Sequence, residues 1–294
     1  MKIIVIIVLG VFILITIYLG VSTYIASVLT VSGESPVTYD ENQISERVVD
    51  VAFKASDGLP LAGWYFPGTN DKAIMFVHGA GNQNRVNEVY GTVEIAKFFI
   101  AQGYTVLLFD LRGTGESTKT RLSFGQYEQN DVRGAFEYLK TQEFKPESIG
   151  IISDSLGAIA TLMASEAIRE AGGIVLDSPA TAVREIVSNI MEDEHSVPRF
   201  MHPGIYLMAK VFYKIDVETV RPIDRIVALK KTPLLFLHGD NDTLIPPSHS
   251  ELLLERVEKG KRVLFPDTKH VETFITHPDL YKKVVGEFFE QNLK

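Results

Sequence analysis

The sequence predicts an α/β fold, with a mostly parallel central sheet and helices on both faces. Short apolar runs recur along the chain, and each leads through a glycine-bearing loop into a stretch of helical periodicity. Continuous apolar strands of this kind are buried on both faces, which is typical of a parallel sheet covered by helices. With 294 residues, of which 46% are hydrophobic, the chain is long enough and apolar enough for such a core.

The sheet is predicted to begin with an antiparallel hairpin. Residues 47–54 alternate as a half-buried strand does, Asp57-Gly58 marks a turn, and a second strand ends near Phe66. Six further strands are predicted at residues 73–77, 104–109, 148–152, 173–177, 233–237 and 262–265. Helices are predicted at residues 86–101, 127–141, 156–170, 248–258 and 278–292.

One interval, about residues 178–232, breaks this alternation and predicts a helical cap insertion. Its segments VREIVSN and GIYLMAKVFY have helical patterns and are separated by prolines. Two interpretations of the cap's apolar side chains stay open, an acyl-binding surface or the cap's own core. These side chains are Phe200, Met201, Ile205, Tyr206, Leu207, Met208, Phe212 and Tyr213.

The chain before the sheet contains an uncharged apolar segment. No charged side chain occurs from Ile3 to Gly33, and about 20 apolar residues at ~1.5 Å rise cover the ~30 Å hydrocarbon core of a bilayer. We therefore predict a transmembrane anchor at residues 1–31, a linker at 32–45 and the α/β domain at 46–294. The alternative is a signal peptide cleaved near Ala26, where small residues stand.

The charges beside this segment favour one orientation. Lys2 stands on its N-terminal side, whereas acidic residues follow it on the other. The positive-inside rule then predicts a cytoplasmic N-terminus, a single-pass protein of the cell membrane and a catalytic domain outside the cytoplasm.

Composition excludes several function classes. A formal net charge of -8 argues against a nucleic-acid partner, because phosphate binding needs a basic face. The chain has no cysteine, which excludes disulfides, thiolate metal sites and cysteine nucleophiles. Chemistry must therefore use serine, histidine, carboxylates or a metal that they hold.

The segment SIGIISDSLGAIATLMA predicts a strand, a tight turn and a helix, with Ser155 at the turn. A nucleophilic serine on such a turn needs small residues two positions away on each side, and Ser153 and Gly157 meet that need. The alternative is that Ser155 only caps the helix that follows.

The segment MFVHGAGNQNR places a small-residue loop after an apolar strand. The backbone N–H of Ala80 in that loop and that of Leu156, the residue after Ser155, are candidate donors to an oxyanion. The alternative for His78-Gly79 is simply the end of a strand.

Two C-terminal segments supply an acid and a base. LLFLHGDNDTLIP places Asp242 after one strand, and FPDTKHVETF places His270 after the next. Taken alone, Asp242 could be a turn residue and His270 an exposed loop histidine. The rival acids are Asp177 and Asp240, and Asp154 is a rival nucleophile one position before the turn.

The segments that carry Ser155, Asp242 and His270 follow one another in the order Ser, Asp, His. With this order, residues 46–292 resemble the α/β-hydrolase family, especially its monoglyceride-lipase-like and serine-aminopeptidase-like members. FDLRGTGES (109–117) is similar to the family's D-x-R-G-x-G-x-S loop, and YEQNDVRGAFEYL (127–139) to the helix before its nucleophile strand. The resemblance implies a catalytic triad and an oxyanion hole, and loop-stabilising roles for two further residues. The residues concerned are Ser155, Asp242 and His270 for the triad, Ala80 and Leu156 for the hole, and Asp110 and Arg112 for the loop. Ser153 departs from the family's usual glycine.

Two groups of candidate metal ligands have poor spacing. They are His270, Glu272 and His277, and the run Glu192–His195. We therefore predict no metal and no cofactor.

The expected function is a serine hydrolase that cleaves ester, thioester or amide bonds of a small-molecule or lipid acyl substrate through an acyl-enzyme. Two alternatives stay open. One is a membrane-tethered binding protein on a catalytically silent fold, and the other is an acyltransferase that uses the same three residues.

Overall fold

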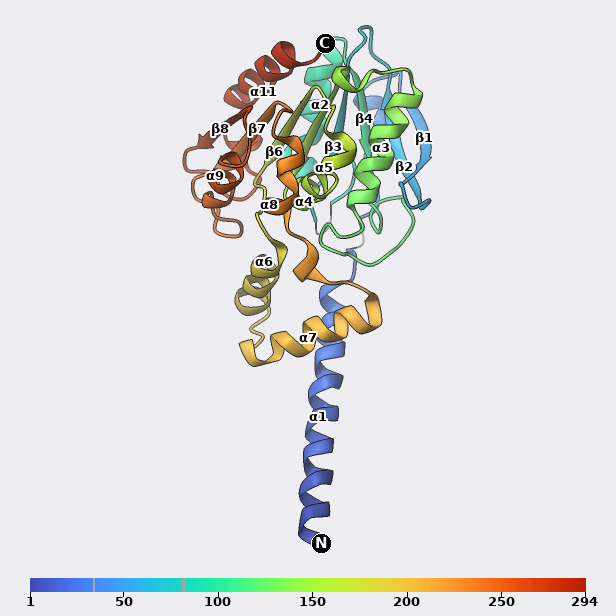
Figure 1. Ribbon diagram of the computed structural model, residues 1–294. Helices are drawn as coiled ribbons and strands as arrows, with labels where there is room; N and C mark the ends of the chain where they lie inside the picture. Colours follow the sequence, from blue (N-terminus) through green and yellow to red (C-terminus); the bar gives the residue numbers. More distant parts are fainter. Residues whose placement is uncertain (34, 81–82) are drawn as a thin grey trace.

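The computed structural model describes residues 1–33, 35–80 and 83–294. Its centre is an eight-stranded sheet of order β1-β2-β4-β3-β5-β6-β7-β8 (Figure 1). The pairs β1·β2 and β2·β4 are antiparallel, and all other pairs are parallel. The strands are β1 Val49–Lys54, β2 Pro60–Phe66, β3 Ala73–Val77, β4 Thr105–Phe109, β5 Ile149–Asp154, β6 Gly173–Asp177, β7 Leu234–Gly239 and β8 Gly260–Phe265.

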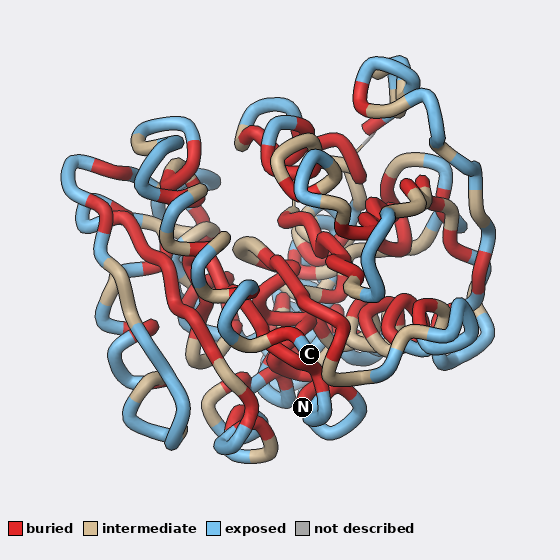
Figure 2. The backbone as a smooth tube through the Cα atoms, turned by 90° about the horizontal axis from the view of Figure 1, so that it is seen from above, coloured by how far each residue is buried: buried red, intermediate tan, exposed pale blue. Residues whose placement is uncertain are grey.

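Helices cover both faces of this sheet, and the predicted fold class is confirmed. Alternate residues of the buried strands belong to two separate apolar clusters. One cluster includes α3 (Gln129–Thr141), α4 (Leu156–Met163), α5 (Ser165–Ile168) and α9 (Ser248–Leu254). The other includes α2 (Thr92–Ala101), α10 (Thr273–Thr276) and α11 (Pro278–Asn292). In Figure 2 the buried segments gather at the centre and exposed segments form the periphery.

Two predicted helices differ from the structure. The helix expected at residues 86–101 begins at Thr92, because Asn87 and Gly91 adopt left-handed conformations around a short 3-10 turn. The helix expected at residues 156–170 is divided at Ala164 into α4 and α5. The hydroxyl of Ser165 there donates to the carbonyl of Leu162, a local bond that competes with the regular helical pattern.

The cap interval contains short helices with a core of their own. They are α6 (Val183–Asn189) and its π-helical extension Ile190–Glu194, α7 (His202–Met208) and its extension Ala209–Tyr213, and α8 (Pro222–Arg225). Met201, Ile205 and Met208 are buried in this core, whereas Phe200, Leu207 and Phe212 are exposed. The cap's apolar residues therefore divide between its core and its surface.

The N-terminal helix α1 (Lys2–Leu29) is long and apolar enough to cross a membrane, with a mean hydropathy of 3.1 in its most apolar window. Its first half projects from the domain without burial, which excludes a buried core helix. Its second half lies against α7 (Figure 1), and there Ser22 and Ala26 are buried.

Candidate active site

Ser155 occupies a strained turn between β5 and α4. Its backbone has φ 47° and ψ -115°, a conformation that non-glycine residues adopt rarely. Its N–H donates to the carbonyl of Asp177 at 3.0 Å. A Cβ at Gly157 would collide with the carbonyl oxygen of Val77, so α4 can pack this closely on β3 only with glycine at that position.

The serine that replaces the usual glycine fits this turn. Ser153 is buried, and its hydroxyl donates to the carbonyl of Val175 on the adjacent strand β6 at 3.1 Å. The small polar side chain is therefore satisfied within the sheet.

The structure brings Ser155, His270 and Asp242 together in one line. The distance between His270 Nε2 and Ser155 Oγ is 2.8 Å, and that between His270 Nδ1 and Asp242 Oδ2 is 2.7 Å. An ionised carboxylate only accepts hydrogen bonds, so these partners assign the imidazole proton to Nδ1. Nε2 is then free to accept the hydroxyl proton of Ser155.

Asp242 is surrounded by donors. The N–H groups of Leu244 and Ile245 donate to its Oδ1 at 3.1 and 2.9 Å, and His238 Nε2 lies 3.3 Å from its Oδ2. Burial raises the pKa of this carboxyl, but hydrogen bonds from His238 and His270 outweigh burial and hold the pKa well below its ordinary value. The group therefore stays ionised beside His270.

The rival carboxylates have other partners. Asp177 accepts from the hydroxyls of Thr273 and Ser178, and burial raises its pKa to about 6. Asp240 accepts from the N–H of Thr268 at 3.3 Å. Neither makes the hydrogen bond to the His270 imidazole that Asp242 makes.

Asp154 lies beneath the turn, as a packing or hydrogen-bonding residue would. Its Oδ2 accepts from Asn87 Nδ2 at 3.1 Å, and burial, followed by the charge of Asp177, raises its pKa to about 8. Asp154 and Asp177 are register partners on β5 and β6 and line a cavity of about 30 Å³.

Ala80 and Leu156 line a second pocket, of about 60 Å³, together with Gly79 and Leu111. The end of the N-terminal segment also contributes to this pocket, through residues 31–33. The two residues predicted to supply the oxyanion donors therefore border a common pocket near the end of α1. None of the eight apolar cap residues named above lines this pocket.

A buried histidine orients the Ala80 peptide. His78 Nε2 accepts from the N–H of Leu111 at 3.0 Å, so the ring proton lies on Nδ1, which donates to the carbonyl of Gly79 at 2.8 Å. Burial lowers the pKa of His78, which favours this neutral ring. The Gly79 carbonyl and the Ala80 N–H point in opposite directions, because they belong to one trans peptide. His78 therefore fixes where the Ala80 donor points, a role that the sequence analysis missed.

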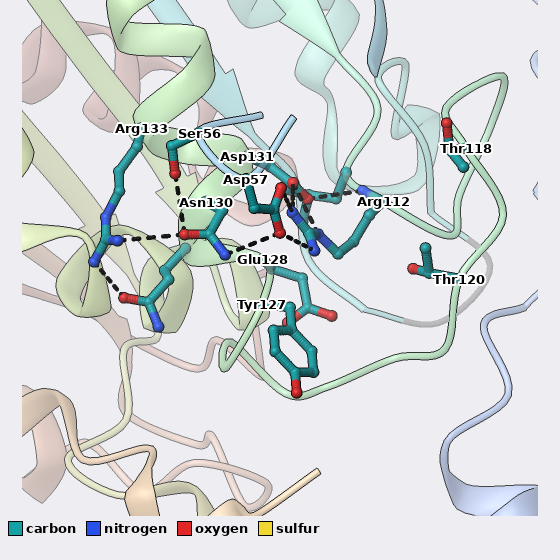
Figure 3. Close-up of polar contacts among 12 residues, drawn as sticks. Ser56, Asp57, Arg112, Thr118, Thr120, Tyr127, Glu128, Asn130, Asp131 and Arg133 are labelled. Atoms are coloured by element: carbon teal, nitrogen blue, oxygen red, sulfur yellow. Dashed lines mark hydrogen bonds and ion pairs between the residues drawn. The ribbon is translucent and has the colours of Figure 1, made fainter. Parts of the chain in front are cut away.

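Two buried arginines hold the 110–117 loop. Arg85 binds Asp110 through its backbone N–H and its guanidinium, at 2.6 to 3.1 Å. Arg112 bonds to both oxygens of Asp57 at 2.9 Å and to Asp131 at 2.7 and 2.9 Å (Figure 3). Bidentate, charge-assisted bonds of this kind fix a backbone firmly. Asp110 and Arg112 thus bind structural partners, as loop-stabilising residues do.

The two groups of candidate metal ligands do not converge. Within the described part of the chain, no three histidine or carboxylate side chains are arranged so that they could hold a metal ion. His277 instead donates to the carbonyl of Pro266 at 2.9 Å, and Glu192 pairs with Arg199 at 2.8 Å.

The sheet order, the strained serine turn and the acid and histidine after later strands define an α/β-hydrolase. The family model for serine aminopeptidase, S33, matches residues 68–227, which is more than half of the chain. The chain therefore belongs to this family.

Its relatives occur in distant organisms. It is 25% identical to YqkD of Bacillus subtilis over 266 residues, which cover 86% of this chain and 83% of YqkD. It is 27% identical to YfhR of Escherichia coli over 250 residues (81% and 79%), and 24% identical to bem46 of Schizosaccharomyces pombe over 231 residues (77% and 69%).

Solved structures share the fold. An esterase of Pyrococcus furiosus, Pf2001, superimposes with a TM-score of 0.74 at 24% identity, covering 90% of this chain and 99% of that one. An acylaminoacyl peptidase of Pyrococcus horikoshii superimposes with a TM-score of 0.61 at 19% identity, and the match covers 87% of this chain and 44% of the peptidase.

Proposed function

We propose that the protein is a membrane-anchored serine hydrolase that cleaves carboxylic ester, thioester or amide bonds through an acyl-enzyme. The observation that carries the proposal is the hydrogen-bonded line from Ser155 Oγ through His270 to Asp242, at 2.8 and 2.7 Å. Membership in a hydrolase family supports it. The esterase and peptidase among the structural neighbours are compatible with it.

In the acylation step, Ser155 Oγ attacks the substrate carbonyl and His270 Nε2 takes the hydroxyl proton. Asp242 stabilises the imidazolium, because its carboxylate accepts the Nδ1 proton. The tetrahedral intermediate then collapses, and His270 gives its proton to the departing alcohol, thiol or amine. The acyl group remains on Ser155.

In the deacylation step, His270 removes a proton from water, and the resulting hydroxide attacks the acyl-enzyme. A second tetrahedral intermediate expels Ser155 Oγ, which recovers the proton from His270. In both steps the N–H groups of Ala80 and Leu156 donate to the oxyanion. Loss of one such donor typically costs about 3–4 kcal/mol in the transition state.

The membrane part of the proposal rests on α1. The buried residues Ser22 and Ala26 of α1 pack against the cap, which supports an uncleaved anchor. Lys2 before the apolar stretch supports a cytoplasmic N-terminus and a hydrolase domain outside the cytoplasm.

The test compares Ser155→Ala with the parent protein. Both are assayed as the full chain in detergent, because residues 31–33 line the pocket at Ala80 and a truncated domain would lack that wall. The substrates are p-nitrophenyl esters of graded chain length, thioesters and peptide amides. We expect kcat/KM to fall at least ~10³-fold in Ser155→Ala.

The matched control is Ser56→Ala, which changes a serine of the entry hairpin turn that bonds Asn130. We expect its kcat/KM to stay within about twofold of the parent value. No hydrolysis by the parent with any substrate would favour the silent binding protein. Product transfer to added alcohols or amines in preference to water would favour the acyltransferase.

A further inference from the structure

The cap carries four exposed apolar residues that are close in sequence, Phe200, Leu207, Val211 and Phe212, here called the cap ridge. Outside α1, Phe200 and Phe212 are the two exposed phenylalanines of the described residues, with 70% and 60% of their surface accessible. Large apolar side chains gathered on one surface indicate a contact site for an apolar partner.

Three of the four residues of the cap ridge, Leu207, Val211 and Phe212, lie in α7 and its extension. Leu207 lies one position before the last residue of α7, and Val211 follows four positions later in the π-helical extension, whereas Phe200 lies just before α7 in the 3-10 turn Arg199–Met201. Ile205 and Met208 lie on a different side and are buried in the cap core. The exposed face is therefore not needed for packing within the domain.

The anchor fixes this helix in position. Tyr18 Oη donates to the carbonyl of Phe200 and accepts from the N–H of Gly204, both at 3.0 Å. A Cβ at Gly204 would lie 2.5 Å from Ser22 Oγ, so only glycine lets the two helices approach this closely. Figure 1 shows α7 running across α1. When α1 spans a bilayer, α7 therefore lies nearly in the membrane plane.

Helix length sets the depth of this crossing. The ammonium of Lys2 belongs at a membrane surface, so the apolar part of α1 begins at Ile3. From Ile3 to Ile17, the residue before the first cap contact at Tyr18, the helix rises only ~22 Å, which is less than the ~30 Å of hydrocarbon to be crossed. The next turns, including Tyr18 and Ser22, must then reach the outer hydrocarbon boundary, and they bring α7 to that depth.

We propose that the cap ridge is inserted into the leaflet through which α1 leaves the bilayer. The partner is a lipid surface, with the four apolar side chains among the acyl chains and the exposed Lys210 and Lys214 beside lipid phosphates. The proposal rests on the proposed anchor and not on catalysis. It makes the substrate an acyl lipid, because the pocket at Ala80 and Leu156 is lined in part by residues 31–33, which directly follow α1.

The test uses single cysteines in the full, cysteine-free chain, each labelled with a nitroxide. The variants are Ile13→Cys in α1, Leu207→Cys and Val211→Cys in the cap ridge, and Leu280→Cys on α11 as an exposed control. Each labelled variant is reconstituted in nanodiscs of phosphatidylcholine that contain about one-fifth phosphatidylglycerol, which gives the membrane an anionic surface. Power saturation then compares collisions with oxygen, which enters acyl chains, and with a water-soluble nickel chelate.

We expect the labels at residues 13, 207 and 211 to collide more often with oxygen, and the label at 280 to collide severalfold more often with nickel. Nickel preference at both 207 and 211, with oxygen preference at 13, would overturn the insertion of the cap and leave the anchor intact. Nickel preference at residue 13 would overturn the anchor and the insertion together. Ester hydrolysis by the same samples tests the catalytic proposal separately.

Discussion

The acids at the ends of β6 and β7 occupy similar positions in the sheet but differ in the pKa of their carboxyl groups. Asp177 ends β6 and Asp242 follows β7, so both carboxylates stand at the same edge of the sheet. Asp177 has two hydroxyl partners, and burial raises its pKa to about 6. Asp242 has two backbone N–H groups and two histidines, and its pKa is held low. The donors around a carboxylate, rather than its strand, decide whether it can support an imidazolium.

The largest expected effect is on Asp242. Asp242→Asn keeps the size of the side chain but removes the charge and presents an NH₂ group that favours the wrong tautomer of His270. We expect kcat/KM for the best ester to fall by about 10⁴-fold, with the thermal midpoint little changed. Steady-state kinetics and a melting curve on the same sample provide the measurement.

Asp177→Asn tests the other side of the comparison. Thr273 and Ser178 donate to different oxygens of Asp177, so one hydroxyl can still donate to the amide oxygen while the other accepts from the amide NH₂ group, and His270 keeps its bond to Asp242. We expect kcat/KM to stay within about tenfold of the parent value. A loss as large as that of Asp242→Asn would show that the acid has been assigned to the wrong strand.

Asp154 is a third acid in this comparison. We expect its substitution to change only the stability of the protein, and to have the smallest effect of the three. Its pKa of about 8 in the folded protein lies above the ordinary 3.8, so the folded state keeps a proton that the unfolded chain releases. The free energy of unfolding therefore falls as pH rises from about 4 to about 8.

Asp154→Asn removes this dependence. We expect the variant to exceed the parent in free energy of unfolding by a few kcal/mol at pH 9, and the gain to vanish near pH 4. Urea unfolding at both pH values measures the difference, and Asp50→Asn on exposed β1 is the matched control. An equal gain at both pH values would contradict the titration argument.

The buried strands were the most predictable part of the fold. Runs such as AIMFV are apolar throughout because helices cover both faces of the sheet, and β3 and β6 match their predicted bounds. The start of α2 was not predictable, since Asn87 in a left-handed conformation leaves no distinct sequence signal. In the candidate site, Ser155, Asp242 and His270 could be predicted because each follows an apolar strand.

The surrounding polar residues were less predictable. His78, Arg85, His238 and Thr273 are buried, and their roles depend on partners distant in sequence. His78, for example, bonds Leu111 across two neighbouring strand ends, and Arg85 bonds Asp110. Tertiary packing also made residues 31–33 part of a pocket lining, although the sequence predicted only the end of the anchor and the start of the linker there.

The most direct test of the central claim is covalent labelling of the full chain with a fluorophosphonate, followed by mass mapping of the modified peptide. We expect one adduct, on Ser155, with a strongly reduced labelling rate in Asp242→Asn and no adduct in Ser155→Ala. Undiminished labelling of Ser155→Ala, or an adduct on a different serine of the parent protein, would contradict it.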